Sequence, residues 1–251
     1  MNHKEILLYG VYSDLRTEMA RRFLGFLWWI IEPVMYMATF YVVFGLALRQ
    51  GGPDYVPFLL SGMIVWKWFD GSVRQAGSSL AMNAGLVQQI YVPKYLFPLI
   101  QIFSNTFKFL IVLALLLVFL LATGKRPSLT WLALIPVFLT QLTFIIAIGF
   151  LLAAIIPFVQ DLKQVVDNLL MLMMFLSGIF FNAEHIPESM RFAFELNPMA
   201  VLIGAYRAIL LDGQWPDWGH LGYSLLVSTP ALLIAGMIFK RFERHYPKLA
   251  L

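Results

Sequence analysis

The chain contains no cysteine and has few charged residues and few histidines for its length of 251 residues. The absence of cysteine excludes disulfide bridges, iron–sulfur clusters and a thiol nucleophile. Charged residues make up only 13% of the chain, against about a quarter in globular domains. The four histidines, His3, His185, His220 and His245, do not stand at metal-ligand spacing with one another. The sequence therefore predicts no metal site.

Motifs for nucleotide chemistry are also missing. The run Gly124-Lys125-Arg126 lacks the upstream glycine and the following serine or threonine of a phosphate-binding loop. Glu184-His185 is a lone acid–histidine pair, and a surface contact is favoured over a catalytic dyad. We therefore expect no catalytic residue and no cofactor in this chain, and any ATP and Mg²⁺ to be bound by a partner ATPase.

Apolar residues dominate what is present: they form 60% of the chain, and the mean hydropathy is +0.77. A helix needs about 20 apolar residues to cross a hydrocarbon layer about 30 Å thick. The sequence predicts an all-α membrane protein with six crossings. These are residues 26–48, 56–80, 98–123, 131–157, 165–183 and 222–242.

The N-terminal segment is expected to be an amphipathic interface helix rather than a cleavable signal. Apolar residues recur at every fourth position among charged ones, at Leu7, Val11, Leu15, Met19 and Phe23. An ordinary solvated helix packed on a partner is the alternative. The expected domains are a cytoplasmic helix at 1–25 and a transmembrane domain at 26–251.

The placement of Lys and Arg predicts the orientation. Eleven basic residues fall on the side of the N-terminus and five on the other, which predicts both termini in the cytoplasm. The eleven are Lys4, Arg16, Arg21, Arg22, Arg74, Lys94, Lys163, Lys240, Arg241, Arg244 and Lys248. The five are Arg49, Lys125, Arg126, Arg191 and Arg207.

The link between crossings five and six is long enough to hold two short helices. An amphipathic part runs from Pro187 to Leu196, and Asn197-Pro198 begins an apolar helix from Met199 to Leu211. Some 13 residues are too few to span a bilayer. We expect two re-entrant or interfacial helices that dip back from the outer surface.

Two predicted crossings carry polar faces. Lys67, Asp70 and Arg74 share one side of the second crossing by helical spacing. Gln101, Ser104, Asn105 and Lys108 share one side of the third. A charge facing lipid near midplane costs about 2.5–3.5 kcal/mol, so both faces should meet protein or water. They either line a hydrated route or join helices, for example through an Asp70–Lys108 pair.

Aromatic residues form the second theme, at 16% of the chain. One side of the first crossing carries Trp29, Pro33, Tyr36, Phe40 and Phe44. The fifth crossing is expected to carry Phe175, Phe180 and Phe181. Aromatic faces can contact the C–H faces of sugar rings without tight anchoring, which suits a sliding polymer. The alternative is that these rings pack helices together or form belts at the membrane interface. Glu32, before Pro33, is expected to anchor a hinge or to pair with a cation such as Arg22.

Three segments in order resemble one family. The first runs from Arg22 through Gly25 and from Trp28 to Glu32-Pro33. The second is Asn83-Ala84-Gly85-Leu86-Val87, followed by Val92-Pro93-Lys94 and Phe97-Pro98-Leu99. The third runs from Phe175 to Phe181 and is followed by Ile186-Pro187-Glu188 and Leu196-Asn197-Pro198. Together they resemble the permease subunits of ABC-2-type polysaccharide exporters, the Wzm/KpsM/TagG-like family. The resemblance extends over almost the whole chain.

This resemblance implies ATP-driven export of a lipid-linked polysaccharide across the bacterial inner membrane. The cargo would be undecaprenyl-linked O-antigen, capsule or teichoic acid, moved by a homodimer with two ATP-binding subunits that carry Walker motifs. The alternatives are an ABC-2 exporter of a small glycolipid or drug, and an intramembrane glycolipid-modifying enzyme using Glu184, His185 and Arg207.

The resemblance and the polar and aromatic patterns together suggest three sets of functional residues. The channel set is Trp28, Trp29, Tyr36, Phe40, Phe44, Lys67, Asp70, Arg74, Gln101, Asn105, Lys108, Phe175, Phe180 and Phe181. The ATPase-coupling set is Arg16, Arg21, Arg22, Gln88, Gln89, Tyr91, Pro93 and Lys94. The outer-gate set is Glu184, His185, Arg191, Asn197, Tyr206 and Arg207.

Overall fold

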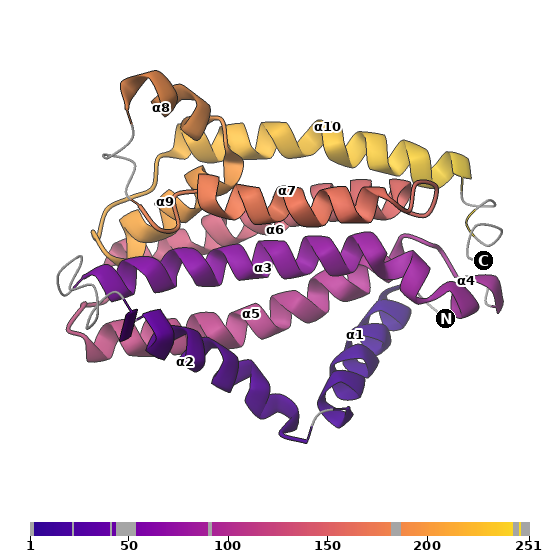
Figure 1. The fold of residues 1–251 in the computed structure, drawn as a ribbon, viewed down its shortest axis with the longest axis horizontal. Coiled ribbons are helices and arrows are strands. Elements are labelled where there is room, and N and C mark those ends of the chain that lie inside the picture. The colour runs from indigo at the N-terminus through magenta and orange to yellow at the C-terminus, as the bar shows by residue number, and fades with distance from the viewer. Residues whose placement is uncertain are drawn as a thin grey trace.

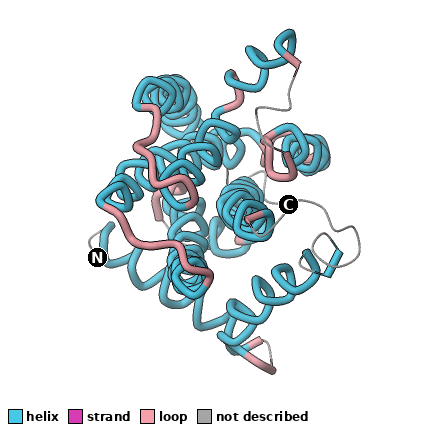
Figure 2. The backbone as a smooth tube through the Cα atoms, turned by 90° about the vertical axis from the view of Figure 1, so that its left-hand side faces the viewer, coloured by secondary structure: helices cyan, strands magenta, loops and turns pink. Residues whose placement is uncertain are grey.

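A computed structural model describes residues 3–21, 23–40, 42–43, 54–89, 92–181, 187–242 and 246. Within these ranges the chain is built from helices joined by short loops, and no strand occurs among them (Figure 2). The predicted all-α class is confirmed for the part of the chain that is described.

Five long helices lie side by side along one axis (Figure 1). They are α3 (Tyr55–Met82), α5 (Leu96–Ala122), α6 (Leu134–Ile155, preceded by the 3-10 turn η3, Leu129–Ala133), α7 (Leu162–Leu176) and α10 (Trp218–Phe242). Helix α3 is central, because it contacts α5, α6 and α7 as well as the shorter helix α9 (Pro198–Leu210).

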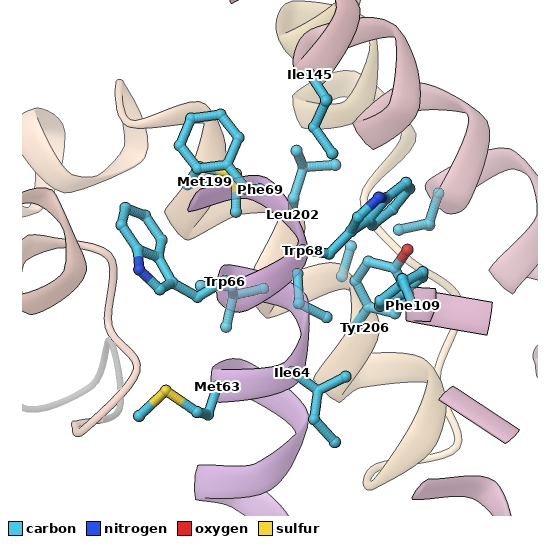
Figure 3. Packing of buried hydrophobic residues seen from close by; sticks show 14 of the residues in the cluster. Met63, Ile64, Trp66, Trp68, Phe69, Phe109, Ile145, Met199, Leu202 and Tyr206 are labelled. Carbon is cyan, nitrogen blue, oxygen red and sulfur yellow. The ribbon is translucent and has the colours of Figure 1, made fainter. Parts of the chain in front are cut away.

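Stacked aromatic rings fill the centre of this bundle (Figure 3). The ring of Trp68 lies 4.1 Å from that of Phe109 and 5.0 Å from that of Phe138, centre to centre and nearly parallel. The indole Nε1 of Trp68 donates to Thr106 Oγ1 at 3.2 Å, so its polar atom is satisfied inside the core. These contacts join α3, α5 and α6.

The first two helices form a V beside the bundle (Figure 1). Helix α1 (His3–Ala20) leans on the start of α5, and α2 (Trp28–Phe40) follows after the 3-10 turn η1 (Gly25–Leu27). Gly25 has φ +50, a conformation that favours glycine, which explains the residue at the bend.

The predicted apolar stripe of α1 holds in part. Leu15 is buried and Leu7, Val11 and Met19 are half-buried, but Phe23 is fully exposed beyond the helix end. The stripe prediction is therefore wrong at Phe23. Helical spacing no longer places a residue once the helix has ended at Ala20.

Among the described residues, three helical segments are long and apolar enough to cross a membrane: Leu96–Ala122, Leu129–Ile155 and Trp218–Phe242. They match the predicted third, fourth and sixth crossings. Helix α3 matches the second in extent with 28 residues, but it carries Lys67, Asp70 and Arg74 near its middle. Of the first predicted crossing, residues 44–48 lie outside the described residues.

The predicted fifth crossing differs most from the structure. Helix α7 ends at Leu176, and Gly178 adopts φ +70, so the chain turns before Phe180 and Phe181. Placing those two rings on the fifth helix was therefore wrong. The two short helices predicted afterwards are present as α8 (Glu188–Glu195) and α9.

The start of α1, the short helix α4 (Ala84–Gln89) and the end of α10 lie at one end of the bundle (Figure 1). Helices α8 and α9 and the start of α3 lie at the other end. This arrangement is consistent with an even number of crossings. Six crossings and cytoplasmic termini stay predictions.

Candidate functional site

A cavity of about 340 Å³ opens between α1, α2, α3 and α5, and we call it the polar cavity. Its polar and aromatic lining includes Glu18, Trp29, Glu32, Tyr36, Lys67, Trp68, Asp70, Gln75, Asn105 and Lys108. Six of these were predicted channel residues: Trp29, Tyr36, Lys67, Asp70, Asn105 and Lys108. The structure therefore brings the polar face of α3 together with those of α2 and α5.

An ion pair between α2 and α3 forms one wall of the polar cavity. Lys67 Nζ lies 2.7 Å from Glu32 Oε1 and 3.5 Å from the centre of the Tyr36 ring. The ammonium thus meets a carboxylate and an aromatic face at once. The partner of Glu32 is Lys67, whereas Arg22, the cation named from the sequence, lies outside the described residues.

A second ion pair joins α5 to α1. Lys108 Nζ lies 2.9 Å from Glu18 Oε2, and the indole Nε1 of Trp29 donates to Glu18 Oε1 at 3.4 Å. Glu18 therefore connects the amphipathic helix with both α5 and α2. The suggested Asp70–Lys108 pair is wrong, because Lys108 takes its carboxylate from α1 and Asp70 pairs with Arg74 on its own helix at 2.8 Å.

Arg74 faces away from the polar cavity, toward α7. Its guanidinium pairs with Asp167 and also donates to the Asp167 carbonyl at 3.2 Å. Asn105 donates to Gln75 Oε1 at 2.8 Å, which links α5 to α3. The polar faces therefore line a cavity and also join helices, while their role in a hydrated route stays a prediction.

Charge balance makes this site tolerable inside a bundle. Three carboxylates, Glu18, Glu32 and Asp70, and two ammonium groups, Lys67 and Lys108, line the polar cavity. Asp70 is held by Arg74, and each lysine touches one carboxylate. Pairing reduces the cost of removing charges from water. The amide groups of Gln75 and Asn105 and the nearby rings add a surface with which a polar, ring-shaped molecule can interact.

Other predicted channel residues lie elsewhere. Trp28 lines a separate hollow on the outer side of α2, and Gln101 donates to Asp14 Oδ1 of α1 at 3.1 Å. Phe175 stacks with Phe180, and Phe181 contacts Phe194. Phe44 lies outside the described residues, as does the side chain of Phe40.

The coupling residues that are described lie on α1, on α4 and in the link that follows α4. A groove of about 540 Å³, the end groove, runs between α1 and the segment from Met82 to Gln101, and Arg21 lines it. Arg16, Gln88 and Gln89 are exposed. Arg22 and Tyr91 lie outside the described residues.

Lys94 does not fit the predicted surface role. Its side chain is buried and donates from Nζ to the Val87 carbonyl at 2.9 Å, beside the half-buried Pro93. Lys94 therefore fixes the position of α4 instead of presenting a charge to a partner. A lysine in a link looks exposed from sequence, and only the packing of α4 against the bundle reveals its burial.

The outer-gate residues divide into buried and exposed ones. The Arg207 guanidinium is enclosed by backbone carbonyls of Phe58, Gly178 and Ile179 at 2.7–3.2 Å and lies 3.4 Å from the centre of the Phe58 ring. Tyr206 is fully buried, and its hydroxyl has no hydrogen-bond partner among the described residues. These two side chains form part of the packing between α9, α3 and the end of α7.

Asn197 and Arg191 are the other described members of the outer-gate set. Asn197 caps α9 by accepting from Met199 N at 3.0 Å, and it also donates to Ser177 Oγ at 3.0 Å. Arg191 is exposed on α8. Glu184 and His185 lie outside the described residues.

Sequence reasoning missed Glu18, Gln75 and Asp167 as site residues. A signal existed for Glu18, since Asp14 and Glu18 stand one turn apart beside the stripe of Val11 and Leu15. No cluster of three or more potential metal ligands occurs among the described residues.

Comparison with known proteins gives an end-to-end match. A family described as ABC-2 type transporter matches residues 8–211. The chain is 33% identical over 248 residues to the O-antigen export system permease protein RfbA of Myxococcus xanthus, covering 97% of this chain and 95% of that protein. A protein of the same name from Klebsiella pneumoniae is 29% identical over 246 residues, covering 98% and 95%.

A more distant relative is the polysialic acid transport protein KpsM of Escherichia coli. It is 22% identical over 233 residues, which cover 92% of this chain and 90% of that protein. The family match includes α3, α5, α6 and α7 and the polar cavity between them and the first two helices. On this evidence the chain belongs to the ABC-2 type transporter family.

Proposed function

We propose that the chain is the membrane permease subunit of an ABC transporter that exports a lipid-linked polysaccharide across the bacterial inner membrane. The observation that carries the proposal is the polar cavity, in which charged, amide and aromatic side chains of α1, α2 and α3 meet those of the membrane-length helix α5. The names of the relatives supply the cargo, because O-antigen and polysialic acid are both sugar polymers.

The polar cavity suits one part of such a route. Aromatic faces such as those of Trp29 and Tyr36 contact the C–H faces of sugar rings without tight directional bonds. The amides of Gln75 and Asn105 exchange hydrogen bonds with hydroxyl groups. Lys67 and Lys108 keep the cavity hydrated while their carboxylate partners limit its net charge.

ATP hydrolysis is assigned to a separate ATPase that binds ATP and Mg²⁺, two copies of which serve a homodimer of this chain. We assign its docking to the end groove and to the exposed surface of α4. Force on α1 would reach the polar cavity through Glu18, which contacts Lys108 and Trp29. We further propose six crossings and both termini in the cytoplasm, with α8 and α9 as re-entrant gate helices at the outer end.

Reconstitution tests the proposal. Proteoliposomes containing this chain and its Walker-motif partner ATPase are expected to take up undecaprenyl-linked polysaccharide only with ATP, measured as protection from an added glycosidase. Lys67→Gln should lower the rate. Lys125→Gln is the matched control, because Lys125 pairs with Asp54 at the opposite end of the bundle from α1.

Two other outcomes would replace the proposal. If a small glycolipid or a drug moves with ATP while the polymer does not, the chain is an ABC-2 exporter with another cargo. Turnover of a lipid-linked sugar by the purified chain without any ATPase would identify an intramembrane enzyme instead.

A further inference from the structure

Another hollow, which shares no lining residue with the polar cavity, lies where α8, α9 and the start of α10 meet. It has a volume of about 430 Å³, and we call it the α8–α10 pocket. Its lining includes Arg191, Glu195, Gly204, Asp217 and His220. These elements lie together at the end of the bundle opposite to the start of α1 (Figure 1).

The floor of the α8–α10 pocket is apolar and open. Ala200, Gly204 and Ala208 stand four residues apart on one face of α9 and leave a shallow surface without large side chains. A Cβ built on Gly204 meets no atom of a described residue within 4 Å. The space above the floor is therefore available to a ligand.

The rim carries charges of both signs. Arg191 and Glu195 are one turn apart on α8, yet neither makes an ion pair or a side-chain hydrogen bond within the described chain. Asp217 Oδ1 accepts from the backbone N–H groups of His220 and Gly219 at 3.2 and 2.8 Å. These bonds hold the pKa of the exposed Asp217 carboxyl below its usual range, which keeps it negative.

The pocket opens at the expected depth of lipid head groups. Helix α10 is one of the three membrane-length segments, and it begins at Trp218 beside the pocket. Trp218 and Trp215 are both more than half exposed, with ring centres 6.4 Å apart. Exposed tryptophans at the end of an apolar helix are typical of the boundary between membrane and water.

We propose that the α8–α10 pocket binds one zwitterionic phospholipid of the phosphatidylethanolamine class. Arg191 holds the phosphodiester, Glu195 and Asp217 accept hydrogen bonds from the primary ammonium, and the floor at Gly204 carries the first part of an acyl chain. The inference requires only that the chain spans a membrane, so it stands apart from the identity of the cargo.

Charge complementarity separates this ligand from others. The rim carries the positive charge of Arg191 and the negative charges of Glu195 and Asp217, whose Oδ2 also lies 3.0 Å from His220 Nδ1, and we expect it to repel an anionic head group that lacks an ammonium. A sugar is a poorer fit, because the floor of small apolar side chains offers it no hydrogen bonds.

The absence of cysteine permits a direct test. Gly204→Cys places a single thiol on the floor, and the full-length variant is labelled with a maleimide in phosphatidylcholine nanodiscs containing either phosphatidylethanolamine or phosphatidylglycerol. Phosphatidylethanolamine at ten times its dissociation constant should slow labelling about tenfold by mass action, and phosphatidylglycerol should not. Arg191→Gln added to this variant should abolish the protection.

The control thiol is Arg126→Cys, which is exposed and follows Lys125, a donor to the Leu211 carbonyl after α9, but does not line the pocket; its labelling should not depend on the lipid. Native mass spectrometry adds a readout without cysteine: the wild-type chain should retain one more phosphatidylethanolamine than Gly204→Leu, which fills the hollow. Equal protection by both lipids, protection by a soluble saccharide alone, or equal lipid retention in Gly204→Leu would each overturn the proposal.

Discussion

Lys67 on α3 and Glu32 on α2 are joined by an ion pair of 2.7 Å beneath the ring of Tyr36. Glu32 precedes Pro33, which lies inside α2 and cannot donate a backbone hydrogen bond there. The side chain of Glu32, next to this missing backbone hydrogen bond, thus joins α2 to α3. Helix α2 is held over the polar cavity partly by charge.

Exchanging these charges should separate their interaction from their individual roles. Glu32→Lys and Lys67→Glu each place like charges together and should lower ATP-dependent polymer uptake, whereas the double variant should recover most of it. Half-exposed ion pairs contribute only about 0.2–1 kcal/mol, so uptake is more informative than stability. The same exchange at Asp54 and Lys125 is the control. A double variant as slow as the slower single variant would show that the pair itself is unimportant.

The contact of α1 with α5 depends on a glycine. A Cβ at Gly10 would lie 2.4 Å from Cδ1 of Ile100, a flexible side-chain end. Gly10→Ala should therefore be tolerated, while Gly10→Leu should displace α1, with overpacking of this kind costing about 1–3 kcal/mol. We expect faster tryptic cleavage at Arg16 and Arg21 in Gly10→Leu. Gly85→Leu, where the space is open, should cleave like the wild type. Unchanged cleavage in Gly10→Leu would contradict this packing.

Arg207 should be essential for stability. Arg207→Met removes the side-chain donors to the carbonyls of Gly178 and Ile179, and each carbonyl left buried without a partner costs about 1–3 kcal/mol. The Phe58 carbonyl also loses a donor but still accepts from Ser61 Oγ at 2.9 Å. The thermal unfolding midpoint in detergent should fall strongly. Arg191→Met, at an exposed arginine, should leave it nearly unchanged. Similar midpoints for the two variants would disprove the role given to Arg207.

Lys94 should act on assembly through the position of α4. Lys94→Glu with Pro93→Gly replaces the buried donor to Val87 by a carboxylate, so the ATPase should no longer co-purify. Gln88→Ala with Gln89→Ala alters only exposed side chains of α4 and should weaken ATPase stimulation without changing the unfolding midpoint. Unchanged assembly and coupling in the Lys94 variant would refute the coupling role proposed for the link from Gln88 to Lys94.

Asp217 should make a small contribution to stability that depends on pH. Backbone N–H groups of His220 and Gly219 lower its pKa in the folded chain. Its stabilising effect is therefore present above the unfolded pKa and is lost as the pH falls through the lower folded pKa. The unfolding midpoints of wild type and Asp217→Asn should differ at neutral pH and converge in acid. A constant difference across the titration would exclude this linkage.

Much of the fold was predictable because the signals are local. Apolar runs predicted α3, α5, α6 and α10 within a few residues, and Asn197-Pro198 predicted the start of α9. The end of α7 was missed, because apolar residues resume at Ile179 directly after Ser177-Gly178. Only the positive φ of Gly178, which is a property of the folded backbone, shows where the chain turns.

The sequence by itself determined that this is a helical, membrane-type chain whose charged residues share defined helix faces, because helical periodicity follows from residue spacing. The tertiary structure alone decided which side chains these charged residues pair with. Lys108 meets Glu18 and Arg74 meets Asp167, each about ninety positions away along the chain. Spacing reports which side chains share a face, but the packing of distant helices decides what that face touches. For the same reason Lys94 and Arg207 became buried donors to backbone carbonyls.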